Sequence, residues 1–324
     1  MTREEALRRI ERAAEEKLME LDLSALELEE VPPEIAKCTQ LETLLLGVSE
    51  EVKTNKLTKF PDAVLPLTNL KTLDLTLNQI TSFPEDLRQL SNLTHLTLFG
   101  AQITEIPEAI GQLSNLVELN LQYNEITQLP EAFGKLSNLI ELNFGNNHIS
   151  SIPEVIGELS NLKRLNLSLN QITEIPEAIC QLWNLEGLWL SGNQITEIPE
   201  AIGQLSSLRG LWLSGNQITE IPEAIGQLSN LEWLSLDTNQ ITLIPDVIGQ
   251  LSNLRFLNLH DNQITEVPEA IGQLSNLEEL YLGRNEIAED IPQATRGLQK
   301  LRKLALYDMR LPRKSHKRPE DGGS

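Results

Sequence analysis

The sequence predicts an α/β repeat fold, a solenoid in which one short unit is stacked on the next. Three observations support this prediction. Asparagine recurs at intervals of 23 residues or a multiple of 23 along most of the chain. Leucines before each asparagine alternate with other residues, which is typical of a short strand. A proline-led segment such as PEAIGQL then follows, and a single helical turn with proline at its first position is expected there.

The repeating unit reads LxxLxLxxNxIxxIPxxIxxLxx, with positions counted from its first leucine. The asparagines in register are Asn55, Asn78, Asn124, Asn147, Asn170, Asn193, Asn216, Asn239, Asn262 and Asn285. Ala101 fills the one missing place. One unit cannot bury its leucines alone, but stacked units share a continuous core. We expect the asparagines to be structural, because their amides can pair with backbone groups that would otherwise cost about 1–3 kcal/mol per site.

The predicted domains follow from this register. Residues 1–17 are an amphipathic helix that caps the first unit, with a partner-binding helix as the alternative. Residues 18–312 are a repeat array of about 12.5 units, and residues 313–324 are a disordered polar tail. One unit is six residues longer than the rest, in the segment 47–54, and forms either a contact loop or a tolerated surface insertion.

Composition excludes several classes of function. The net charge of −21 argues against binding to nucleic acid or anionic membranes, which are themselves negative. Cys38 and Cys180 lie six repeats apart and cannot pair in an extended array, so a disulfide scaffold is excluded. The charged N-terminus has no apolar signal-peptide segment, and no run is long enough to span a membrane. A cytoplasmic protein is expected.

The ten asparagines in register and the LxxLxLxxN units resemble the leucine-rich-repeat superfamily over residues 18–311. This resemblance implies a right-handed horseshoe with a parallel concave sheet and short helical turns on the convex side. The 23-residue IPxxI unit is similar to the intracellular branch, including Ras-group-related repeats and the repeat region of bacterial Roco proteins. Roco proteins continue into a GTPase module, but no GxxxxGK[ST] phosphate loop occurs here. The resemblance therefore implies a recognition half, with signalling as its context and a small GTPase or GTPase module as one candidate partner.

No constellation for chemistry is evident. No histidine lies beside a cysteine or a second histidine at metal-ligand spacing, and no serine stands in a GxSxG elbow. The recurring TEIPE glutamates are best explained as a solvated acidic surface. The sequence therefore predicts a non-enzyme with no catalytic residue, metal or cofactor.

Function in such an array is expected where the units differ, on the strand side. Position five holds tryptophan in two neighbouring units that share the stretch LWLSGNQITEIPE. The predicted aromatic patch is Trp189, Trp212, Trp233, Phe256 and Tyr281. The arginines expected beside it are Arg209, Arg255 and Arg284, and a polar ladder of Asn120, Asn143 and Asn166 precedes it. Tryptophan, tyrosine and arginine are enriched at binding hot spots. The structural alternative is that these side chains only stack along the sheet.

The sequence therefore predicts a recognition scaffold that binds another protein on its concave face. The first alternative is a glycan- or peptide-binding module that uses the aromatic patch. The second is a purely structural protein whose repeats expanded by duplication, since residues 188–206 and 211–229 are identical.

Overall fold

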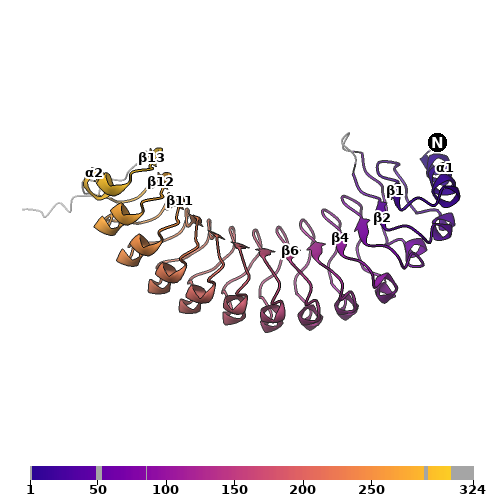
Figure 1. Cartoon of the computed structure of the whole chain (residues 1–324), viewed down its shortest axis with the longest axis horizontal. Coiled ribbons are helices and arrows are strands. Elements are labelled where there is room, and N and C mark those ends of the chain that lie inside the picture. Colours follow the sequence, from indigo (N-terminus) through magenta and orange to yellow (C-terminus); the bar gives the residue numbers. More distant parts are fainter. Residues whose placement is uncertain (1, 49–52, 85, 288–290, 308–324) are drawn as a thin grey trace, which may run out of the picture.

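The computed structural model describes residues 2–48, 53–84, 86–287 and 291–307. These residues form a curved solenoid (Figure 1). Its short strands build one parallel sheet of 13 strands in chain order along the concave side, and helical turns line the convex side. The predicted solenoid with a parallel concave sheet is confirmed.

Each strand is three residues long. The strands are β1 (Glu20–Asp22), β2 (Thr43–Leu45), β3 (Thr72–Asp74), β4 (His95–Thr97), β5 (Glu118–Asn120), β6 (Glu141–Asn143), β7 (Arg164–Asn166), β8 (Gly187–Trp189), β9 (Gly210–Trp212), β10 (Trp233–Ser235), β11 (Phe256–Asn258), β12 (Glu279–Tyr281) and β13 (Lys303–Ala305).

The convex turns are mostly 3₁₀ helices of three to five residues. They are η1 (Pro33–Lys37), η2 (Asp62–Val64), η3 (Leu87–Leu90), η4 (Glu108–Gln112), η5 (Glu131–Lys135), η6 (Glu154–Glu158), η7 (Glu177–Gln181), η8 (Glu200–Gln204), η9 (Glu223–Gln227), η10 (Asp246–Gln250), η11 (Glu269–Gln273) and η12 (Thr295–Gly297). Two α-helices, α1 (Thr2–Glu15) and α2 (Ile291–Ala294), lie near the two ends of the sheet.

The core is a continuous column of leucine and isoleucine between the strands and the turns. In one unit the fully buried side chains are Leu185, Leu188, Leu190, Ile195, Ile202 and Leu205. Burying a side chain of this size stabilises the fold by about 1.5–3 kcal/mol. Strand pairing repeats at 23 residues, as in Leu165 opposite Leu188 and Leu188 opposite Leu211. Every unit therefore adds the same layer to the core.

The asparagine ladder is structural, as predicted. Asn193 is 7% exposed, and its Nδ2 donates to the carbonyls of Leu167 and Leu190 at 3.0 and 2.9 Å. Its Oδ1 accepts the backbone N–H of Ile172 in the preceding unit at 3.0 Å. One side chain thus satisfies three backbone groups that lie inside the solenoid, where water does not reach them.

The helical turns begin one residue later than predicted. Pro199 has φ −66° and ψ 147°, so it precedes η8 instead of opening it. Its carbonyl accepts the N–H of Ile202 at 3.0 Å, and the Ile202 carbonyl accepts that of Leu205 at 3.1 Å. Proline suits this place because its extended backbone directs the first acceptor into the turn, and its own missing N–H is not needed there.

Helix α1 covers the open N-terminal end of the core. Its apolar face, Ala6, Ile10 and Ala13, is fully buried against β1 and η1. Arg9 Nη1 donates to the carbonyl of Asp22 at 2.9 Å, and Gln40 Nε2 donates to the carbonyl of Ala13 at 3.0 Å. The predicted tail at 313–324 and residues 49–52 of the long unit lie outside the described residues.

Candidate functional site

Two tryptophans lie side by side on the concave face. Trp189 and Trp212 are paired across β8 and β9, with ring centroids 4.5 Å apart and ring planes 4° apart. Strand side chains alternate between faces, and the buried Leu188 and Leu190 place Trp189 on the face opposite the core. The centroid separation is close to the strand spacing of about 4.7–4.9 Å, so the rings stand as successive rungs along the sheet.

A glycine under each ring allows this arrangement. A Cβ added to Gly187 would lie 2.5 Å from Cη2 of Trp189, and one added to Gly210 would come closer still to Cη2 of Trp212. Each ring therefore folds back over its own strand, onto the glycine two residues earlier. Gly210 is also the strand partner of Trp233, so the ring of Trp212 lies beside the Trp233 position.

The rest of the aromatic patch forms a second group on β10 to β12. Trp233 is 37% exposed, and the guanidinium carbon of Arg255 lies 5.9 Å from its ring centroid. Phe256 and Tyr281 pack with ring centroids 5.4 Å apart. The ammonium of Lys303 lies 4.7 Å from the Tyr281 ring centroid. Cations thus cover a face of two of these rings.

The structure separates the three predicted arginines. Arg209 and Arg255 stand at position two, before their strands, where they pair with Glu232 at 3.2 Å and Glu278 at 2.8 Å. Arg284 stands at position eight, after its strand, with φ 54°. It therefore lies beyond the opposite ends of the strands from the other two arginines.

The arginine pairs belong to a column of alternating charge that our sequence reasoning missed. The column at position two is Lys163, Glu186, Arg209, Glu232, Arg255, Glu278 and Arg302. Lys163 pairs with Glu186 at 2.9 Å, and Arg302 reaches Glu278 at 3.3 Å. The Lys163 hydrogen bond holds the pKa of Glu186 below its usual value. The alternation of sign at 23-residue intervals was a readable signal.

The asparagines of the predicted polar ladder form hydrogen bonds within the solenoid. Asn120, Asn143 and Asn166 are half-buried, and the Oδ1 of each accepts the backbone N–H two residues further on at 3.0 Å. These bonds shape the turn that leaves the strand. Asn143 Nδ2 also donates to Gln122 Oε1 at 3.0 Å. Within the described residues, the side-chain amides of Asn120 and Asn166 donate no hydrogen bond.

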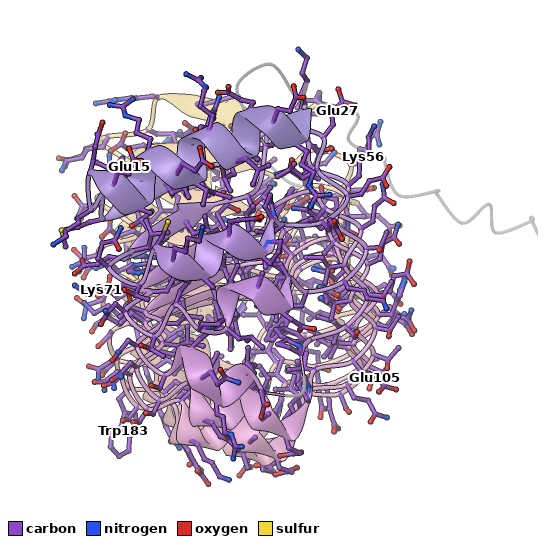
Figure 2. All side chains as sticks on the ribbon, turned by 90° about the vertical axis from the view of Figure 1, so that its right-hand side faces the viewer. Glu15, Glu27, Lys56, Lys71, Glu105 and Trp183 are labelled. Carbon is purple, nitrogen blue, oxygen red and sulfur yellow. The ribbon has the colours of Figure 1, made fainter. Side chains whose placement is uncertain are left out.

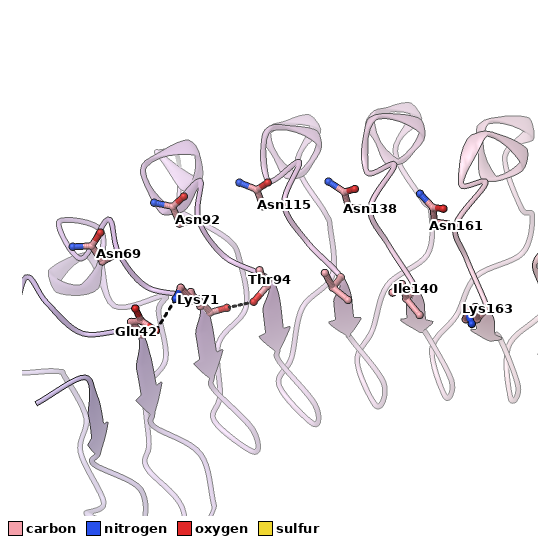
Figure 3. A pocket seen from close by; sticks show the side chains of 11 residues that line it. Glu42, Asn69, Lys71, Asn92, Thr94, Asn115, Asn138, Ile140, Asn161 and Lys163 are labelled. Carbon is pink, nitrogen blue, oxygen red and sulfur yellow. Dashed lines mark hydrogen bonds and ion pairs between the residues drawn. The ribbon is translucent and has the colours of Figure 1, made fainter.

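A groove of about 710 Å³ runs along the side of the solenoid, where the chain enters the strands (Figure 3). It is lined by Glu42, Asn69, Lys71, Asn92, Thr94, Asn115, Val117, Asn138, Ile140, Asn161 and Lys163. Its asparagines form a second ladder, at position 23, that the sequence reasoning overlooked. Asn115 Nδ2, for example, donates to the carbonyl of Ser91 at 2.9 Å. The recurring LSNL was the signal for it.

The described residues offer little for catalysis. They contain no group of three or more His, Cys, Asp or Glu placed to hold a metal ion. Cys38 and Cys180 are both buried as free thiols, and burial raises the pKa of Cys180 to about 11. His260 Nδ1 is buried without a hydrogen-bond partner among the described residues. The His260 ring packs on Tyr307, with ring centroids 5.2 Å apart. In the described part of the chain, no helix is long and apolar enough to cross a membrane.

These features define a repeat solenoid whose variable side chains gather on a concave sheet. Residues 84–166, 177–254 and 246–317 match the leucine-rich repeat region, and residues 51–103 and 161–182 match further leucine-rich repeat families. The chain belongs to the leucine-rich-repeat family. Comparison with curated protein sequences gives no match.

Solved structures agree with this assignment. A leucine-rich-repeat protein of Leptospira interrogans is 34% identical, with a TM-score of 0.79 over 93% of this chain and 81% of that chain. An internalin of Listeria monocytogenes is 25% identical, with a TM-score of 0.83 over 96% and 89%. The Arabidopsis receptor kinase HAESA, solved with the peptide hormone IDA and the co-receptor SERK1, is 27% identical, with a TM-score of 0.73. That match covers 92% of this chain and 55% of HAESA.

Proposed function

We propose that this chain is a recognition scaffold that binds a protein partner on its concave face, with the aromatic patch as the main contact. The stacked pair of Trp189 and Trp212 is the observation that supports this most directly. Both rings lie outside the leucine core and are half-buried. Glycine in a strand weakens it, yet Gly187 and Gly210 stand under the rings. Two strand positions thus lack a side chain, and this absence leaves room for the two rings to lie against the backbone.

A ring that is already fixed suits binding. An aromatic side chain held in one orientation loses little conformational freedom when a partner arrives, so more of its contact energy remains as affinity. The structural relatives point the same way, since the HAESA structure contains a peptide hormone. A peptide segment of a partner is therefore a suitable occupant of the patch.

The glycan alternative has less support. A sugar stacks on an exposed ring face, but Trp189 and Trp212 each cover one face of the other. Arg255 and Lys303 lie over the rings of Trp233 and Tyr281. Fewer ring faces are therefore left for a sugar to stack on.

The finer part of the proposal places the chain in the cytoplasm, in signalling, with a small GTPase or GTPase module as one candidate partner. The 23-residue unit, similar to Ras-group-related and Roco repeats, supports this. So do the free thiols of Cys38 and Cys180, which suit a reducing compartment.

The test compares captured proteins by quantitative mass spectrometry. The baits are the native chain, a Trp189→Ala/Trp212→Ala variant, and Trp183→Ala as the matched control. Trp183 is 65% exposed on the side of the solenoid (Figure 2), two residues after the convex turn η7. Hot-spot truncations cost about 2 kcal/mol or more each, so a partner should be depleted at least tenfold on the double variant and retained on the control.

Loss of the rings uncovers the strand backbone at the two glycines, so folding is checked by circular dichroism. A Trp189→Phe/Trp212→Phe variant keeps an aromatic cover and should bind with intermediate strength. Equal capture by the native chain and a folded double-alanine variant would contradict the proposal.

A further inference from the structure

Asp237 occupies position seven, just beyond β10, and three side chains converge on it. Ser214 Oγ lies 2.6 Å from its Oδ1, Ser235 Oγ lies 2.8 Å from it, and Asn258 Nδ2 lies 2.9 Å from it. These donors come from three successive units. Because all three address the same oxygen, they fix the orientation of the carboxylate, and Oδ2 accepts no hydrogen bond within the described residues.

The three donors are all neutral, although the half-buried carboxylate carries a charge. No lysine or arginine of the described residues forms an ion pair with Asp237. Hydrogen bonds between a carboxylate and a cation are about twice as strong as neutral ones, and partial removal of water strengthens them further. Among the described residues, the group is therefore an oriented anion without a counter-ion.

The two glutamates at position two of this unit and of the second unit after it are already engaged. Glu232 is paired with Arg209, and Glu278 with Arg255 and Arg302. Asp237 differs from these two glutamates because its hydrogen-bond donors are neutral and not arginines. The net charge of −21 also favours a basic partner over an acidic one.

Asp237 is also a diagonal neighbour of Trp212, beyond the end of that residue that is opposite Gly210, over which its ring lies. Ser235 is the strand partner of Trp212, and Ser214 follows Trp212 by two residues on the same face. Both serines donate to Asp237. Diagonal neighbours across strands lie about 7–8 Å apart, which is within the reach of one long side chain. An arginine or lysine could therefore contact the near edge of the Trp212 ring with its alkyl stem and the carboxylate with its cation.

We propose that the partner presents an arginine or lysine whose stem packs on Trp212 and whose cation pairs with Oδ2 of Asp237. This inference rests on the proposed function, and it specifies the chemistry of the partner segment at that site.

The probe is a random dodecapeptide library displayed on phage and selected on the native chain. Asp237→Asn is the informative variant, because an asparagine keeps the shape and an Oδ1 for the three donors while it removes the charge. Asp246→Asn is the matched control, since Asp246 is an exposed residue of η10 on the convex side and its loss changes the net charge equally.

Selected peptides should be enriched in arginine or lysine. Their affinity, measured by calorimetry, should fall about 10- to 100-fold on Asp237→Asn and stay within twofold on Asp246→Asn. Neutral replacement of the basic peptide residue should cause the same loss on the native chain and little further loss on Asp237→Asn, as a coupled pair requires.

The remaining outcomes separate this inference from the proposed function. Peptides that depend on Trp189 and Trp212 but bind Asp237→Asn with native affinity would overturn the basic-residue inference and leave the aromatic patch as the site. A library that yields no peptide sensitive to the tryptophans would contradict both.

Discussion

A single side chain can connect two units of this array, as Asn193 does with its three backbone hydrogen bonds. Ala101 marks the place where that connection is missing. It is 7% exposed, so the site is buried, but it has no amide. The backbone N–H of Ile80 is equivalent to that of Ile172, which donates to Asn193. Ala101 stands in the place of that asparagine and offers the Ile80 N–H no side-chain acceptor. A buried N–H without a side-chain acceptor lowers stability.

We expect Ala101→Asn to stabilise the chain by about 1 kcal/mol, because the new Oδ1 can accept the Ile80 N–H and the new Nδ2 can reach the carbonyls of Leu75 and Leu98. Denaturant unfolding measures the change. Ala101→Leu is the control, since leucine has a similar size but no amide, and it should not stabilise. If the asparagine variant is no more stable than the leucine variant, the role given to the ladder is wrong.

The sequence predicted the inner asparagine ladder because an isolated amide among leucines, in strict register, has no other physical reason. It did not reveal the second ladder, which includes Asn115. Asparagine is ordinary in a polar turn, so its 23-residue recurrence there attracted no notice. The placement of each tryptophan over a glycine was also missed, because it depends on a rotamer and not on the pattern of residue types.

At the scale of the strand, residues at the same position of adjacent units lie side by side and form columns along the sheet. The column of alternating charge joins β7 to β13 along one edge, and Lys163 with Glu186 is one of its pairs. The partly exposed pair contributes little by itself. Its importance lies in register, because opposite charges meet only when adjacent units are aligned at 23 residues.

This pair should make stability depend on pH in the acid range. The pKa of Glu186 is lowered in the folded chain from 4.5, so its contribution is present above about pH 4.5 and is lost as the pH falls through the folded value. We expect Glu186→Gln to lower the melting temperature at pH 7, with the difference from the native chain shrinking towards pH 3. In a Lys163→Met background the substitution should have a clearly smaller effect, since only the charges of Arg209 and Arg164 then remain to lower the pKa of Glu186. A difference that stays constant with pH would exclude this explanation.

For the whole molecule, stability should be distributed along one dimension, because each strand pairs only with its neighbours in sequence. The N-terminal end depends on α1, whose Ile10 is fully buried. The amphipathic pattern predicted a helix within residues 1–17, and α1 spans Thr2–Glu15. The sequence could not indicate which aromatic rings would touch or which carboxylate would lack a cation, since those depend on side chains from several units.

Ile10→Ala should cost about 2–5 kcal/mol at that end of the array. Hydrogen exchange followed by mass spectrometry should show faster exchange in β1 and β2 and unchanged exchange in β8 and β9. Arg8→Ala, at an exposed position of the same helix, should leave both regions unchanged. Faster exchange in every strand would show that the array unfolds as one cooperative unit instead.

The nearest-neighbour pairing of the sheet also has a mechanical consequence. Among the described residues, no hydrogen-bonded strand pair bridges the two ends of the arc, so each coil is held by its neighbours in sequence. A change in the opening of the arc can be divided among all the joints between adjacent coils, with only a slight rotation at each. We therefore expect the arc to widen or tighten around a bound partner by slight bending along its whole length and not at a single hinge, with every leucine layer still packed.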